Sequence, residues 1–102
     1  MQNEYDKETL RLAELAKALS HPARVHILNY LAQQKECTFT EVYFELPITK
    51  ATVSQHLKEL KSCGLINSRS EQLKVKYSIN QENMEIVKNL FGEFFEKIHN
   101  PD

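Results

Sequence analysis

The chain has 102 residues, of which 41% are hydrophobic and 26% charged, and its formal net charge is −1. This length fits one domain with a modest core, and no apolar run reaches the length of a membrane-spanning helix, so we expect no membrane partner. The first six residues lack the basic start and apolar stretch of a signal peptide, and two cysteines are too few for a disulfide framework, so we expect a cytoplasmic protein with reduced thiols.

Two helices are predicted at the start of the chain. The first covers residues 6–19, and one of its faces carries three leucines: Leu12, Leu15 and Leu19. Pro22 suits the first turn of a second helix, where its missing N–H group costs nothing, and either Ser20 or His21 can cap that helix. We expect the second helix to bury three aliphatic side chains: Val25, Leu28 and Leu31.

The next segment predicts a helix-turn-helix unit. A capping box, in which the side chains of Thr38 and Glu41 each bond the other residue's backbone N–H, begins a third helix. Pro47 ends this short helix, and after a tight turn Thr49 caps the fourth. Two helices with separate start signals and a tight turn between them are typical of a helix-turn-helix.

The fourth helix, residues 49–60, has a polar face suited to DNA. Its buried side carries three aliphatic residues at helical spacing: Val53, Leu57 and Leu60. Its exposed side carries lysines and short hydrogen-bonding groups: Lys50, Thr52, Ser54, Gln55 and Lys58. Such groups reach base edges in a major groove while lysines lie near phosphates, and an amide such as that of Gln55 pairs bidentately with adenine. His56 borders the buried stripe; we keep it among the candidate DNA contacts, although a packed histidine is the favoured interpretation.

A basic β-hairpin follows. Gly64 ends the fourth helix, and two strands are predicted over residues 65–69 and 74–79. Three cations of the hairpin can reach phosphates or the minor groove: Arg69, Lys74 and Lys76. Tyr77 is as compatible with a place in the core as with a contact to DNA. Residues 47–79 hold six basic and two acidic side chains, while both flanks are net negative; this distribution indicates a nucleic-acid footprint, with chance clustering on a solvated face as the alternative.

A long final helix is predicted over residues 81–98, with Asn80 as its cap. Its apolar seam has heptad-like spacing: Met84, Val87, Phe91, Phe94 and Ile98. Ile86, Leu90 and Phe95 widen this stripe onto a second side. We therefore expect a homodimer in which the first and last helices form the interface; a wide core stripe in a monomer is the alternative.

Together these elements predict a single domain over residues 1–102, mainly α-helical with a small β-hairpin, in the order α-α-α-α-β-β-α. This is a winged helix-turn-helix, and double-stranded DNA is its expected partner. A winged-helix protein-interaction module and an RNA-binding winged helix compete with this interpretation, although RNA binding usually requires exposed aromatics. We expect no enzyme, because the chain has two glycines and neither a phosphate-cradling loop nor a catalytic triad at a recognisable spacing.

Four motifs resemble the ArsR family of bacterial winged-helix repressors: residues 20–24 (SHPAR), 54–60 (SQHLKEL), 63–66 (CGLI) and 75–79 (VKYSI). The resemblance extends over about residues 10–98, with the motifs in the family's order and spacing. It implies a homodimer that pairs helices from both ends of the chain and binds an imperfect palindrome. It also implies a repressor, and many members release DNA when a metal, a metalloid or an oxidant reaches a sensor site.

The sensor site expected from the resemblance is incomplete. Metal-responsive members carry a Cys-x-Cys pair at the start of the third helix, where this chain has Cys37, Thr38 and Phe39, so we expect neither a metal nor another cofactor. The family's second site lies on the last helix, whose groups here fit a solvated face: Glu85, Glu93, Glu96 and His99. Cys37 is a candidate redox sensor if a helix N-terminus lowers its pKa, and a small half-buried packing residue is the alternative.

Overall fold

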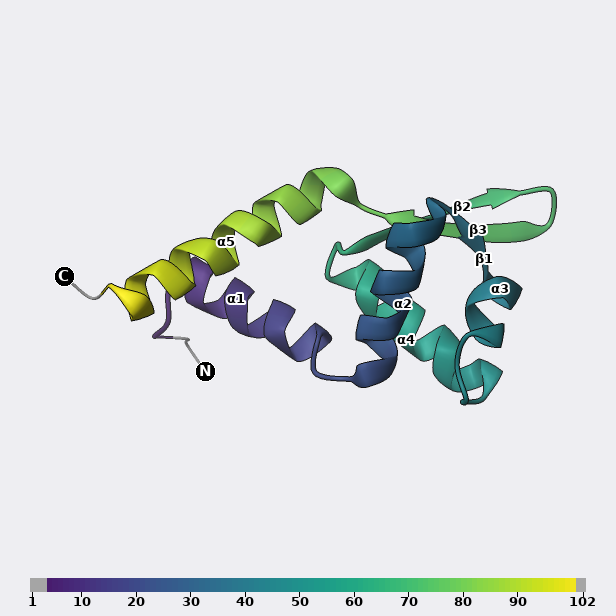
Figure 1. Cartoon of the computed structure of the whole chain (residues 1–102), viewed down its shortest axis with the longest axis horizontal. Coiled ribbons are helices and arrows are strands. Elements are labelled where there is room, and N and C mark those ends of the chain that lie inside the picture. Colours follow the sequence, from purple (N-terminus) through teal and green to yellow (C-terminus); the bar gives the residue numbers. More distant parts are fainter. Residues whose placement is uncertain (1–3, 101–102) are drawn as a thin grey trace.

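The fold is given by a computed structural model that describes residues 4–100. The outermost parts of the predicted domain, residues 1–3 and 101–102, lie outside the described residues. The elements are, in chain order, α1 (Lys7–Ala18), α2 (Pro22–Gln34), β1 (Cys37–Thr38), α3 (Phe39–Phe44), α4 (Lys50–Ser62), β2 (Ile66–Glu71), β3 (Lys74–Ile79) and α5 (Gln81–His99) (Figure 1).

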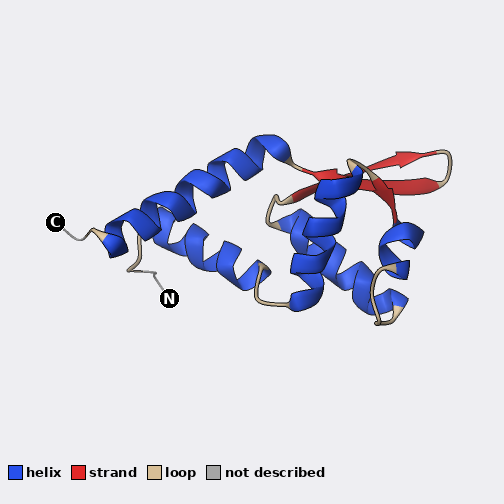
Figure 2. Ribbon diagram, in the orientation of Figure 1, coloured by secondary structure: helices blue, strands red, loops and turns tan. Residues whose placement is uncertain are grey.

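The molecule is elongated. One pair of helices lies at one end, and the other three helices lie with the sheet toward the opposite end. Figure 1 shows α1 and α5 side by side at the end where the described chain begins and finishes. The α2, α3 and α4 helices lie together at the opposite end, and Figure 2 shows the β2–β3 hairpin projecting beyond them. The α3 helix and the tip of the hairpin therefore lie far from the α1–α5 pair, whereas the C-terminal end of α4 contacts α1 and α5.

Local capping signals set most helix starts as the sequence predicts. Both halves of the capping box are present in α3, where the Thr38 hydroxyl accepts from the Glu41 N–H and the Glu41 carboxylate accepts from the Thr38 N–H. The Thr49 side chain caps α4, and the Asn80 side chain caps α5. For α2, Pro22 does occupy the first turn, but His21 is the capping residue and makes no side-chain bond to the helix.

The sheet has one strand more than predicted. The two residues of β1 pair with β3, so the sheet is antiparallel in the order β1-β3-β2. The β3 strand has its predicted bounds, whereas β2 begins one residue later than predicted and continues to Glu71. It is longer because Gln72 and Leu73 both have positive φ angles, as the central residues of a tight two-residue hairpin turn do.

The core lies among the five helices and the base of the sheet, and α4 contributes more buried side chains to it than α3 or α5. All three residues predicted for the buried side of α4 are fully buried: Val53, Leu57 and Leu60. The predicted inward face of α2 is partly wrong, because Val25 is 41% exposed while Ile27 is buried. Ile27 and Leu31 are four residues apart and form one stripe, with Leu28 packed at its edge.

Candidate nucleic-acid interface

The five predicted contact residues on the outer face of α4 are all exposed: Lys50, Thr52, Ser54, Gln55 and Lys58. Two of them bond to neighbours in their own helix or its cap. The Gln55 amide donates to the Glu59 carboxylate at 3.0 Å, and the Thr52 hydroxyl lies 2.9 Å from that of Thr49. Bonds on an exposed surface exchange readily with other partners, so these groups are available to base edges.

His56 packs against α2 instead of facing outward with the other candidates. Its Nδ1 atom accepts a hydrogen bond from Arg24 Nε at 3.0 Å, and its ring centroid lies 5.4 Å from that of His21. Burial lowers the pKa of His56, and the charge of Arg24 lowers it further. Since Nδ1 accepts only when it is unprotonated, the structure favours a neutral, packed histidine.

The cations of the β2–β3 hairpin, the wing, are unequally available. Arg69 makes two bonds to Glu36 and a further ion pair with Glu71. Lys76 Nζ lies 3.4 Å from the Glu71 carboxylate. Lys74 makes no ion pair with any residue between 4 and 100. The charge count over residues 47–79 missed Glu36, because that residue lies outside the segment and reaches the wing only through the fold.

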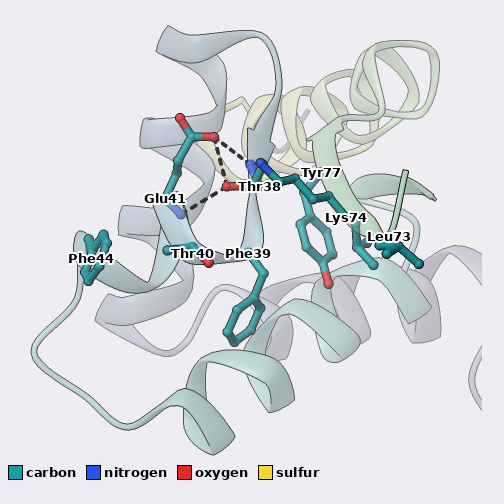
Figure 3. A pocket seen from close by; sticks show the side chains of 9 residues that line it. Thr38, Phe39, Thr40, Glu41, Phe44, Leu73, Lys74 and Tyr77 are labelled. Atoms are coloured by element: carbon teal, nitrogen blue, oxygen red, sulfur yellow. Dashed lines mark hydrogen bonds between the residues drawn. The ribbon is translucent and has the colours of Figure 1, made fainter. Parts of the chain in front are cut away.

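A groove of about 710 Å³ separates α3 from the wing (Figure 3). The Thr38–Glu41 capping box lies at one end of this groove, and Lys74 and Leu73 lie along the wing side. Tyr77 is half-buried against the core, and burial raises the pKa of its hydroxyl, which supports the core interpretation. Among the residues that the structure describes, Lys74 is the wing cation without an ion pair, and it lies at the edge of this groove.

The thiols do not have the environment of a redox sensor. Cys37 lies in β1, is 1% exposed, and its pKa is raised by burial and by the Glu41 carboxylate. The condition for the redox hypothesis, a pKa lowered by a helix N-terminus, is therefore not met. Cys63 is also buried, and its Sγ atom donates to the Leu60 carbonyl oxygen.

Among residues 4–100, no three His, Cys, Asp or Glu side chains lie together as a metal site would require. None of the described helices combines the length and the apolar character needed to cross a bilayer.

The predicted dimer surface divides between core and exterior. Leu15 and Val87 are buried within the chain itself, so they belong to the core and do not face solvent. Four other residues of the predicted dimer surface are half-buried: Leu12, Leu19, Met84 and Phe91. Phe94 and Ile98 are exposed, at 40% and 60%, and α5 also exposes Ile86 and Phe95. The α5 helix therefore leaves four large apolar side chains exposed, three of them in its last turns.

A helix-turn-helix followed by a β-hairpin defines a winged helix-turn-helix protein, which confirms the predicted fold class. Residues 21–68 match the family described as bacterial regulatory protein, arsR family. The chain is 39% identical over 80 residues to the transcriptional repressor PagR of Bacillus anthracis, a similarity that covers 76% of this chain and 79% of PagR. The chain belongs to the ArsR family of transcriptional regulators, and the resemblance noted in the sequence is thereby confirmed.

Solved structures support the same assignment. HlyU from Vibrio cholerae is 26% identical, with a TM-score of 0.71 and coverage of 92% of this chain and 97% of HlyU. A homodimeric winged helix-turn-helix DNA-binding domain from Mycobacterium bovis is 27% identical, with a TM-score of 0.69 and coverage of 95% and 92%. The similarity thus extends over nearly the whole chain, including α1 and α5.

Proposed function

We propose that this protein is a transcriptional repressor that binds an inverted-repeat operator as a homodimer. The observation that carries the proposal is the outer face of α4, where exposed amide and hydroxyl groups are flanked by lysines. The helix-turn-helix holds this face away from the core, as insertion into a major groove requires. Repression is the favoured direction because PagR is a repressor. A protein that acts on bacterial DNA works in the cytoplasm.

Dimerisation would supply a second α4 helix, which would bind the second half-site of the operator. The exposed apolar surface of α5 supports it, and the homologous domain from Mycobacterium bovis is homodimeric. In a symmetric dimer the two α4 helices read half-sites about 34–36 Å apart, which is about one turn of DNA. We propose that Phe94 and Ile98 lie in this interface, with Leu12, Leu19, Met84 and Phe91 supporting it.

The contacts divide into base readers and phosphate anchors. Gln55 is the proposed adenine reader, and Ser54 and Thr52 contact a base edge or a phosphate. Lys50, Lys58 and Lys74 hold the backbone. We propose no thiolate metal site at Cys37, because Phe39 stands at the second position of the Cys-x-Cys pair that the family resemblance implies for metal-responsive members.

Selection from random duplexes at near-physiological salt tests this function. Enrichment of an inverted repeat is the expected result. Sequence-independent, salt-sensitive binding alone would contradict it and favour a protein-interaction module. A monomer in light scattering at micromolar concentration would contradict the proposed dimer.

Two variants test the division of roles. Gln55→Ala should cost about 1–3 kcal/mol on the selected operator and relax one position in each half-site. Lys74→Ala should weaken binding to every duplex and reduce the salt slope by roughly one unit. Identical effects of both variants across sequences would refute the assignment of readers and anchors.

A further inference from the structure

The outer face of the wing carries charges of both signs. Side chains alternate along β2 and β3, and the register opposes Arg69 to Lys76 and Glu71 to Lys74, so these four side chains share one face. Glu36 reaches the same face because it directly precedes β1, whose Thr38 pairs with Lys76. The wing therefore combines three cations with two carboxylates, one of them from a distant part of the chain.

The carboxylates of Glu36 and Glu71 occupy the same donor groups of Arg69 and Lys76 that a DNA phosphate would bind. Arg69 Nε and Nη2 donate to the two Glu36 oxygens at 2.7 and 2.8 Å, and its third nitrogen pairs with Glu71. Lys76 Nζ lies 3.4 Å from Glu71 Oε1 and 4.0 Å from Glu36 Oε1. The bond from Arg69 lowers the pKa of both Glu36 and Glu71, so both carboxylates stay ionised at a more acidic pH than an ordinary glutamate does.

The geometry determines whether DNA can displace these pairs. An isolated pair on a protein surface contributes little, but a bidentate Arg–carboxylate pair within a network is the strong exception. Arg69 is held by two carboxylates at once, and Lys76 shares both of them. Glu41 does not join this network, because its carboxylate is bound to Thr38.

We propose that Glu36 and Glu71 are positioning residues that hold Arg69 and Lys76 off the DNA backbone. The wing then offers Lys74 as its phosphate contact. This inference rests on the proposed function, since it concerns how strongly a DNA-binding protein holds DNA of any sequence. Phosphate contacts supply essentially all sequence-independent affinity, so two carboxylates that occupy two cations keep that affinity low.

The test compares the salt dependence of binding in charge-matched variants. The first variant, Glu36→Gln with Glu71→Gln, releases both cations. Its control, Glu85→Gln with Glu93→Gln, removes the same charge from exposed positions on α5 that make no ion pair among the described residues. Binding of the selected operator and of a random duplex is measured from about 50 to 200 mM salt, a range in which each phosphate contact changes affinity severalfold.

The released cations should steepen the salt slope on both duplexes by about two units, at about 0.9 per phosphate contact. The variant should then lose about tenfold more affinity than the wild type across that salt range. The control should keep the wild-type slope. Adding Arg69→Gln to the first variant should bring its slope back by about one unit, which a merely structural role of the carboxylates would not produce.

The possible failures are distinguishable. A wild-type protein that selects an inverted repeat, with no steeper slope in the first variant, would refute this inference and leave the proposed function standing. Equal steepening in the control would also refute it, because net charge alone would then explain the result. A wild-type protein that retains no duplex at low salt would reject the proposed function and this inference together.

Discussion

Replacement of Gly64 by alanine should destabilise the protein strongly. Gly64 follows Cys63, the residue that caps the C-terminal end of α4, and its φ of +82° is a conformation that disfavours every residue with a Cβ atom. The N–H of Gly64 donates to the Lys61 carbonyl and that of Leu65 to the Leu60 carbonyl, which is the Schellman pattern. An alanine Cβ here would lie 2.5 Å from Asn83 Nδ2, closer than van der Waals contact allows.

Two contributions add to the expected cost of Gly64→Ala. The left-handed backbone costs an alanine about 1–2 kcal/mol. The Asn83 side chain must move, and its bond of 2.6 Å to the Gly64 carbonyl oxygen is lost, which costs about 1 kcal/mol more. The free energy of unfolding should therefore fall by about 2–3 kcal/mol, a large share of the 5–15 kcal/mol that stabilises a typical domain.

Urea unfolding at one fixed protein concentration measures this change, because the stability of a dimer depends on concentration. Gly92→Ala is the matched control: a Cβ at this position of α5 meets no atom within 4 Å, so that variant should be more stable by about 0.5–1 kcal/mol. In an Asn83→Ala background, Gly64→Ala should cost only the backbone term of about 1–2 kcal/mol. A Gly64→Ala protein as stable as the wild type would refute the reasoning.

Three further predictions concern single side chains. Thr49→Ala should lower the free energy of unfolding by about 1 kcal/mol in urea titrations, because the hydroxyl caps α4, and an unchanged midpoint would contradict this role. The pKa of His56 is lowered in the folded protein by burial and by Arg24, so the unfolded state binds the proton more readily. Stability should fall as the pH drops below about 6.5 and level off below the folded pKa, and His56→Gln should flatten this decline. In a Cys63→Ala protein, Cys37 should resist alkylation until urea unfolds the chain, because the thiol is buried and its pKa is raised; rapid labelling of the native protein would contradict the burial.

The features that the sequence predicts correctly depend on neighbouring residues. A capping bond joins residues three positions apart, as Thr38 and Glu41 show, so the residue types and their spacing suffice to identify it. The buried face of α4 follows in the same way from the spacing of its aliphatic residues. The winged helix-turn-helix could be predicted because nearly every element carries such a local signal.

The features that the sequence does not reveal depend on distant residues. A two-residue strand has no periodicity of its own, and β1 exists because Cys37 pairs with Tyr77 of β3. That pairing also brings Glu36 to Arg69, which lies 33 positions away. The sequence therefore predicts too high a positive charge for the wing, because a charge count over residues 47–79 omits the Glu36 carboxylate, which only the fold brings there.

The C-terminal end of α4 is held by both helices of the proposed dimer interface. The last carbonyl groups of a helix have no donor within the helix. Here Arg11 of α1 donates to the Cys63 carbonyl oxygen at 2.8 Å, and Asn83 of α5 donates to that of Gly64 at 2.6 Å. A dimer reads two half-sites at a fixed spacing only if each recognition helix keeps its position relative to the interface. In the proposed dimer, these two bonds would fix the C-terminal end of each α4 helix to the α1 and α5 helices of the interface, without passing through the wing.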